Sequence, residues 1–267
     1  MSLFHLILVA IIQGVTEFLP VSSSGHLILL PRLTGADDQG LAIDVAVHVG
    51  TLGAVIHYFW SDVKQALAGI PQIIRGRIET PQARLALGLV IATIPTVIAG
   101  GIVYLTGLEQ TLRSVAVIGW AMLGFGLVLY WMDQKGVQTK RSSDWGLKDA
   151  MIMGLWQMLA LIPGTSRSGI TITGARQLGY TREDGARIAM LMSIPTIVAS
   201  GVLLSVDVVR EADTQLAKDG AIAAAFAFVS ALLALNLMMR LLRSVSFTPY
   251  VIYRVILGAI LLMIAYS

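Results

Sequence analysis

A polar stretch from Gln13 to His26 follows directly on an apolar segment near the start of the chain. It contains a carboxylate, three consecutive hydroxyls and an imidazole. An ionisable side chain such as Glu17 is costly to hold in a lipid bilayer, and charges inside membrane segments usually belong to functional sites. The fold must therefore enclose this stretch in protein or let it line a polar cavity.

The rest of the chain has the composition of a membrane protein. Hydrophobic residues make up 56% and charged residues 13% of its 267 residues, and the mean hydropathy is +0.77, far from the averages of soluble proteins. The net charge of +3 is small and the basic residues lie in short loops, which predicts membrane lipids as partners and no nucleic acid. Cysteine is absent, so disulfides and cysteine nucleophiles are excluded.

Six segments are long and apolar enough to cross a membrane, which takes about 20 residues. They cover residues 41–60, 85–105, 115–132, 188–209, 221–242 and 247–266. The first apolar segment, residues 3–19, is marginal in length and stops at Pro20, and the next, residues 26–33, is too short to cross. We therefore expect residues 3–33 to form a re-entrant helical hairpin.

A second hairpin is predicted after a polar loop in the middle of the chain. An apolar helix from Ala150 to Pro163 precedes a loop rich in Gly, Ser and Thr and a short helix that ends at Leu178. Residues 157–169 align with residues 13–25, Gln157 with Gln13, with one residue inserted, and residues 194–201 match residues 94–101 at five of eight positions. These similarities indicate a duplication.

The predicted fold is a single all-α polytopic membrane domain, residues 1–267, with two repeats, residues 1–132 and 146–267. Cytoplasmic loops carry an excess of Lys and Arg. If both hairpins return to the side that they entered, the basic loops fall on one side and both termini face outside. The fold is then six transmembrane helices plus two re-entrant helical hairpins in an inverted-topology repeat.

The first hairpin carries the groups of a phosphoryl-transfer site. Gln13 and Glu17 are four residues apart and share one helix face, Ser22 begins a run of three serines, and the pair Gly25-His26 is expected to open the next helix. Free N–H groups at a helix start bind anions. A hydroxyl nucleophile, an imidazole and a carboxylate suit transfer through a covalent seryl intermediate. In the alternative interpretation, the serines only cap a helix and Glu17 pairs with an arginine.

The second hairpin offers a matching anion clamp. Arg167 lies among the hydroxyls of Ser166, Ser168 and Thr171, and arginine suits bidentate recognition of phosphate. Neutralisation of Glu17 by Arg167 is the alternative, and both roles can coexist. Neither hairpin is complete alone, so we expect one site built from both.

Three further polar residues lie inside predicted spans. Asp44 and His48, four residues apart, could touch a metal, but an interior pair is the preferred interpretation. Arg254, seven residues into the last span, can extend its charged end toward the membrane surface.

These motifs resemble those of the bacterial undecaprenyl-diphosphatase family, also known as the bacitracin-resistance proteins. Residues 13–17 fit its Glu/Gln-x-x-x-Glu motif, and residues 163–171 fit its Pro-Gly-x-Ser-Arg-Ser-x-x-Thr motif; the serine run before His26 fits as well. The similarity covers essentially the whole chain. It implies hydrolysis of a long-chain prenyl diphosphate to the monophosphate, which recycles the carrier lipid for peptidoglycan synthesis, cell wall biogenesis and cell shape and confers bacitracin resistance. It also implies a divalent cation, Mg or Ca, and a bacterial inner (plasma) membrane, with the active site facing the periplasm.

By this resemblance, Ser23 would attack the terminal phosphorus and His26 would act as general base. Glu17 would hold the metal or orient the imidazole, and Arg167 would stabilise charge on the transferred group. The remaining substrate-binding candidates are Gln13, Ser22, Ser166, Ser168 and Thr171. Gln13 stands where the motif allows either Glu or Gln, so this chain has one carboxylate fewer, and the ion can instead be bound by the diphosphate of the substrate.

A transporter or flippase of a phosphorylated lipid is the main alternative, because broken helices in an inverted repeat are typical of transporters. A second lipid-phosphatase superfamily is disfavoured, because it needs a histidine after the Ser-Arg pair and the second half of the chain has none. The sequence leaves open the oligomeric state, with a homodimer as one option, and which of the three serines attacks.

Overall fold

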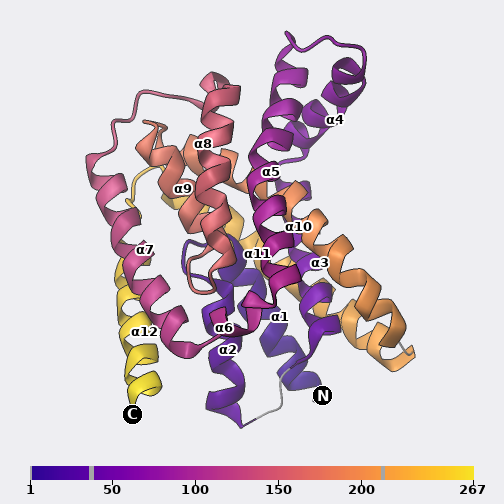
Figure 1. Ribbon diagram of the computed structural model, residues 1–267, viewed down its shortest axis with the longest axis vertical. Helices are drawn as coiled ribbons and strands as arrows, with labels where there is room; N and C mark the ends of the chain where they lie inside the picture. Colours follow the sequence, from indigo (N-terminus) through magenta and orange to yellow (C-terminus); the bar gives the residue numbers. More distant parts are fainter. Residues whose placement is uncertain (1, 36–38, 212–213) are drawn as a thin grey trace.

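The computed structural model describes residues 2–35, 39–211 and 214–267. Within these residues the chain is helical and forms no strand (Figure 1). Its α-helices are α1 Leu3–Phe18, α2 Ser23–Thr34, α3 Leu41–Tyr58, α4 Trp60–Ile74, α5 Pro81–Thr106, α6 Leu108–Leu112, α7 Val115–Lys135, α8 Leu147–Met158, α9 Arg167–Gln177, α10 Arg182–Glu211, α11 Thr214–Leu241 and α12 Thr248–Tyr266. Two short 3₁₀ helices are Ser142–Asp144 and Leu159–Leu161.

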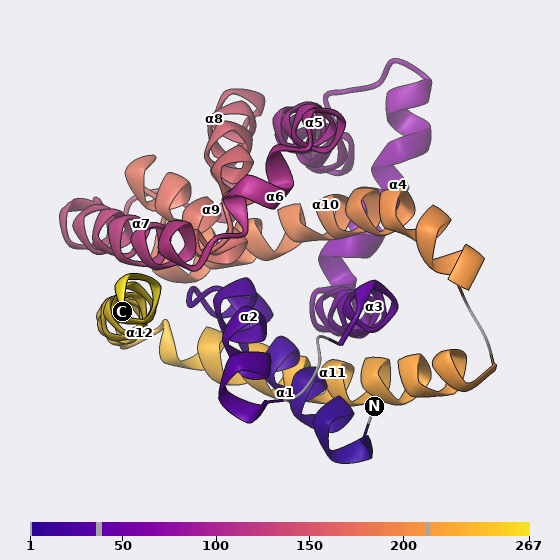
Figure 2. The same cartoon turned by 60° about the horizontal axis from the view of Figure 1, so that its bottom comes forward.

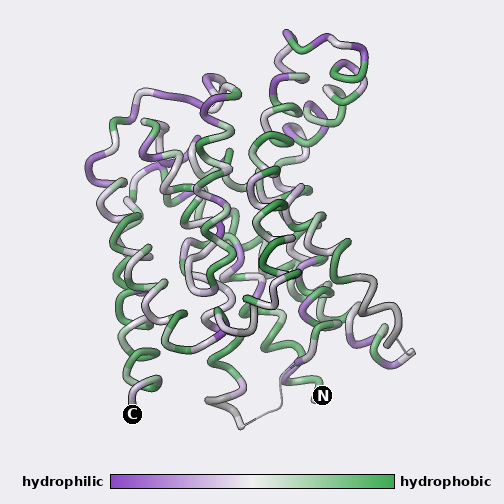
Figure 3. Tube along the Cα trace, viewed as in Figure 1, coloured by the Kyte–Doolittle hydropathy of each residue, from purple (hydrophilic) through white to green (hydrophobic). Residues whose placement is uncertain are grey.

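The six predicted spans are confirmed. Among the described residues, α3, α5, α7, α10, α11 and α12 are each long and apolar enough to cross a membrane. The all-α polytopic class is therefore correct. The connection that follows α3 contains helix α4, which begins at Trp60 and packs against α5. Hydrophilic residues gather in the α7–α8 connection and around the end of α4 (Figure 3).

Helix α11 packs against both α1 and α3, and small residues allow the close approach (Figure 2). A Cβ added at Gly14 of α1 would lie 2.6 Å from the carbonyl oxygen of Ala227, and one added at Gly50 of α3 would lie 2.2 Å from that of Ala224. Only glycine fits at such contacts. The polar face of α1 is thereby fixed in depth and orientation.

Two short helix pairs, α1–α2 and α8–α9, carry the predicted hairpin motifs. Ser22, before α2, has φ of 72°, and Ser166, before α9, has φ of 67°; no other non-glycine residue of the described chain has positive φ. Ser22 Oγ lies 3.1 Å from Ser24 Oγ, and Ser166 Oγ lies 3.1 Å from Ser168 Oγ. The two turns thus share one local geometry. The predicted start of α2 at Gly25-His26 is wrong: the left-handed turn at Ser22 lets the helix begin at Ser23.

A buried cluster at one end of the bundle joins α7, α9, α10 and α12. Asp133 accepts hydrogen bonds from Nε of Arg176 at 3.0 Å, Nε of Arg182 at 2.8 Å and the backbone N of Phe247 at 3.2 Å. The side chains of Asp133 and Arg176 are both fully buried. One carboxylate therefore connects the two halves of the chain.

Candidate active site

Glu17 lies at the centre of the candidate site and links the two helix pairs. Its Oε2 accepts hydrogen bonds from Ser23 Oγ at 3.0 Å and from Gln13 Nε2 at 2.8 Å. Its Oε1 accepts one from Arg167 at 2.8 Å. The carboxylate is buried, so its neutralisation by a guanidinium offsets part of the cost of its burial. The structure therefore brings these four predicted residues together.

Arg167 keeps donor capacity for a ligand. One of its terminal nitrogens, Nη2, donates to Glu17, whereas the other, Nη1, is buried without a hydrogen-bond partner. A buried unsatisfied donor is costly, and a phosphate oxygen would satisfy it. Ser23 and Arg167 are the first residues of α2 and α9, so two helix N-termini, each with partial positive charge, lie beside the carboxylate.

His26 is held by other groups than Ser23. Its Nδ1 lies 2.7 Å from the carbonyl oxygen of Ser22, and its Nε2 lies 2.6 Å from the hydroxyl of Tyr253 on α12. The serine that the sequence assigned to this imidazole donates to Glu17 instead. Tyr253 was not predicted, because no motif connects a tyrosine of the last helix with residues more than 200 positions earlier.

Two serine hydroxyls join the two hairpins, and a threonine hydroxyl stabilises the start of α9. Ser24 Oγ accepts from the backbone N of Gly164 at 3.2 Å, and Ser168 Oγ donates to the carbonyl oxygen of Leu19 at 3.0 Å. Thr171 Oγ1 donates to the carbonyl oxygen of Arg167 at 2.7 Å. These bonds set the relative position of the two loops.

His48 belongs to the site although sequence analysis treated it as an interior partner of Asp44. Its Nε2 lies 3.1 Å from Gln13 Nε2 and 3.8 Å from Glu17 Oε2. Its Nδ1 contacts the carbonyl oxygen of Asp44, one turn earlier on α3. The spacing within α3 could not reveal this contact, because the partners of Nε2 come from α1.

Arg254 does not extend toward the membrane surface, so that prediction is wrong. Its side chain is fully buried and donates to the carbonyl oxygens of Thr165 at 2.9 Å, Gly164 at 3.2 Å and Met122 at 3.2 Å. The loop before α9 offers carbonyls that its own helices leave unpaired, and the guanidinium satisfies them. Helix α12 thereby fastens the loop that precedes Arg167.

Gln157, the counterpart of Gln13 in the second hairpin, lies outside the site. It is fully buried in α8 and its Nε2 donates to Thr196 Oγ1 at 3.0 Å and Thr96 Oγ1 at 3.4 Å. These threonines belong to the matched segments 94–101 and 194–201, which lie in α5 and α10. Both segments contact Gln157 in the second hairpin, so this glutamine supports the packing of α5, α8 and α10, whereas Gln13 lies in the site.

The described residues contain no group of three His, Cys, Asp or Glu side chains that could hold a metal ion. One observation nevertheless fits a cation: the amide oxygen of Gln13 is buried without a hydrogen-bond partner beside Glu17. Magnesium and calcium prefer oxygen ligands, and magnesium often binds one or two carboxylates plus substrate phosphates. The residues therefore fit an ion that the substrate also ligates.

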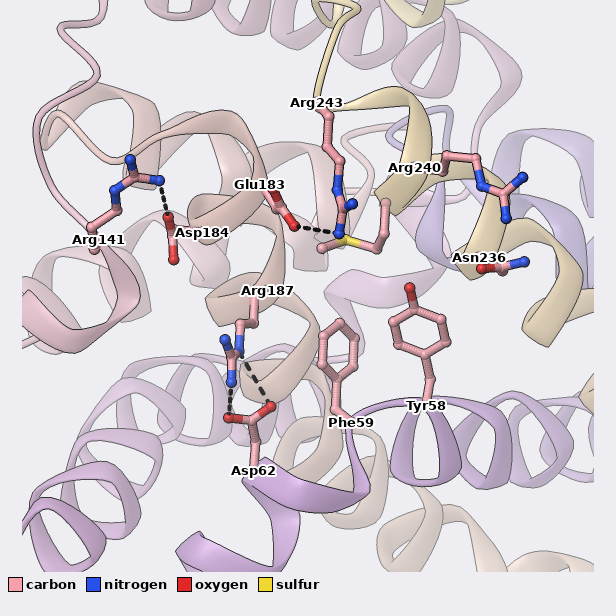
Figure 4. A pocket seen from close by; sticks show the side chains of 11 residues that line it. Tyr58, Phe59, Asp62, Arg141, Glu183, Asp184, Arg187, Asn236, Arg240 and Arg243 are labelled. Atoms are coloured by element: carbon pink, nitrogen blue, oxygen red, sulfur yellow. Dashed lines mark hydrogen bonds and ion pairs between the residues drawn. The ribbon is translucent and has the colours of Figure 1, made fainter.

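A cavity of about 500 Å³ lies apart from these residues, where α3 meets α4 and where α10 begins (Figure 4). Three ion pairs line it: Arg187 with Asp62 at 2.5 Å, Arg243 with Glu183 at 3.3 Å and Arg141 with Asp184 at 3.5 Å. None of the predicted site residues borders this cavity. Its arginines are largely neutralised, unlike the free guanidinium nitrogen of Arg167.

Almost the whole chain is similar to known proteins. The model of the family described as "Bacitracin resistance protein BacA" matches residues 6–260. A protein of Ruegeria pomeroyi called undecaprenyl-diphosphatase is 73% identical over 267 residues, covering 100% of both chains. A relative with the same name in Roseobacter denitrificans is 71% identical, and the match covers 100% of both chains. Another in Maricaulis maris is 45% identical, and the match covers 98% of this chain and 99% of the relative.

Proposed function

Since the chain belongs to the bacitracin resistance protein BacA family, we infer that it is an undecaprenyl-diphosphatase, a multi-pass membrane hydrolase that releases phosphate from a prenyl diphosphate lipid. This activity confers bacitracin resistance and returns carrier lipid to peptidoglycan synthesis. The observation that carries the mechanism is the contact of Glu17 with both Ser23 and Arg167.

In the proposed first step, the terminal phosphate binds the free nitrogen of Arg167, which keeps its other nitrogen on Glu17. Ser23 Oγ then attacks the terminal phosphorus, and its proton passes to Glu17, the carboxylate that already accepts its hydrogen bond. The bond from phosphorus to the bridging oxygen breaks, and the lipid monophosphate leaves. The guanidinium and the two helix N-termini stabilise the charge on the transferred group.

In the second step, water attacks the phosphoserine. His26 accepts the proton of the water, and Ser23 Oγ leaves with the proton held by Glu17, so inorganic phosphate is released. The structure favours Ser23 over its neighbours as nucleophile, because Ser22 and Ser24 contact each other and Ser24 also accepts from Gly164.

The oxygens of Gln13 and Glu17 would be the protein groups that hold a divalent cation, Mg or Ca. It would neutralise charge on the phosphates. Ser166, Ser168 and Thr171 stabilise the start of α9 around Arg167 and thereby act on substrate binding.

The first test measures phosphate release from a long-chain prenyl diphosphate by detergent-purified protein. We expect Arg167→Ala to lower the release at least about 100-fold, because the guanidinium contacts both Glu17 and the transferred group. Arg187→Ala is the matched control: its ion pair with Asp62 lines the separate cavity, so release should stay within twofold. Wild-type protein that binds the lipid without releasing phosphate would favour a transporter or flippase.

The two hairpins are proposed to be re-entrant, within the bacterial plasma membrane, so that both chain ends and the active site face the periplasm. The distribution of basic loops supports this orientation. A homodimer is compatible with this arrangement.

A single cysteine placed at Val137, in the α7–α8 connection, tests the orientation. The chain has no cysteine of its own, so any label reports this position. We expect it to resist a membrane-impermeant thiol reagent in intact cells and to react after the cells are opened. A cysteine at Ser267 is the matched control and should react in intact cells; the reverse pattern would invert the topology.

A further inference from the structure

Both ring nitrogens of His26 are occupied, and this fixes the position of its proton. A carbonyl oxygen can only accept a hydrogen bond, so Nδ1, 2.7 Å from the carbonyl oxygen of Ser22, must carry the hydrogen. In the neutral imidazole, Nε2 is then the basic nitrogen. It can accept a hydrogen bond, and the hydroxyl that donates to it at 2.6 Å belongs to Tyr253.

Tyr253 also fixes the plane of the imidazole. The two rings are stacked, with centroids 5.6 Å apart and planes 2° from parallel. The next residue, Arg254, is anchored to the carbonyl oxygens of Gly164 and Thr165 in the loop before α9. The turn of α12 that carries Tyr253 is therefore held against the active-site loop.

The contact lies nearer the protein surface than Glu17 does. Tyr253 is 45% exposed, whereas the carboxylate of Glu17 is buried. The charged and titratable side chains nearest the reaction site on the surrounding elements include Glu17 on α1, His48 on α3, Arg167 on α9 and Arg254 on α12. None of the described contacts joins any of these four to His26, so the hydroxyl of Tyr253 is the described side-chain group that controls Nε2.

We propose that Tyr253 is a positioning residue of the diphosphatase, which holds the neutral imidazole of His26 with Nε2 turned toward the space where the substrate and water enter. The proposal rests on the hydrolysis inferred above. Incoming water replaces the hydroxyl of Tyr253 as the hydrogen-bond donor to Nε2. The imidazole of His26 then already has the orientation and the tautomer that a general base needs. This arrangement lowers the cost of organising the second step, as partners of catalytic histidines commonly do.

Tyr253→Phe tests the proposal, because it keeps the stacked ring and removes only the hydroxyl. We expect kcat to fall about 10-fold with KM changed less than twofold, since general-base catalysis contributes roughly 100-fold or more and is only partly lost. Tyr250→Phe, three residues earlier on α12, is the control, because the ring of Tyr250 packs near that of Phe247 at 6.3 Å. It should keep wild-type kcat.

A spectroscopic measurement separates positioning from packing. With ¹⁵N-labelled histidine, the protein has four imidazoles, and the pair missing in His26→Asn identifies His26. We expect hydrogen on Nδ1 and a hydrogen-bonded, unprotonated Nε2 in wild type, and loss of the Nε2 hydrogen bond in Tyr253→Phe. Hydrogen on Nε2 in wild type, or wild-type kcat in Tyr253→Phe, would overturn the proposal. Absence of phosphate release by wild type would instead contradict the inferred hydrolysis.

Discussion

Replacement of Ser23 by alanine is expected to lower kcat at least about 100-fold while the protein keeps its fold. The hydroxyl of Ser23 donates to Glu17 at 3.0 Å, and the side chain is the first of α2. Its removal takes away the nucleophile but leaves the ion pair between Glu17 and Arg167 intact. Phosphate release from the prenyl diphosphate measures the effect, and melting in detergent checks the fold.

Ser24→Ala is the matched control for this experiment. Ser24 Oγ accepts from the backbone N of Gly164 and contacts Ser22, so its loss weakens the contact between the hairpins without removing the nucleophile. We expect a reduction of less than about 10-fold, in proportion to one lost hydrogen bond of about 1 kcal/mol. Near-normal turnover in Ser23→Ala together with an inactive Ser24→Ala would move the nucleophile to the neighbouring serine.

The second large effect concerns stability. Asp133→Asn is expected to destabilise the protein by about 3–5 kcal/mol, because it leaves the buried guanidinium of Arg176 without its countercharge. The asparagine also cannot accept from Arg182 and Phe247 as the carboxylate does. The measurement is the melting temperature in detergent, with an expected fall on the order of 10 °C.

Asp144→Asn provides the comparison, because Asp144 is exposed and accepts from the backbone N of Arg141. We expect a change of less than about 1 kcal/mol for such a surface contact. If both variants melted alike, the buried cluster would not be what joins the two halves at this end of the bundle.

The sequence was sufficient to predict the six long helices, because membrane spans are defined by length and apolarity within one segment. It also predicted that the two polar motifs would meet, because neither hairpin carries a complete set of catalytic groups alone. The contact at 2.8 Å between them bears this out. These are features that each segment carries in its own composition.

Contacts between distant segments could not be predicted in the same way. The start of α2 depended on a left-handed backbone at Ser22, which non-glycine residues adopt rarely. His48 and Tyr253 enter the site from α3 and α12, and neither belongs to a local motif. Arg254 was misinterpreted because the carbonyls that it binds become available only when the loop before α9 is folded.

The buried guanidinium of Arg254 also affects the order in which the parts of the active site form while the chain is synthesised. The residues that carry out the chemistry emerge from the ribosome before α12, yet the loop that positions Arg167 is held by Arg254, a side chain of α12. A partly synthesised chain therefore carries its catalytic groups in an unfinished setting. The setting of Arg167 is complete only when α12 has packed beside α7.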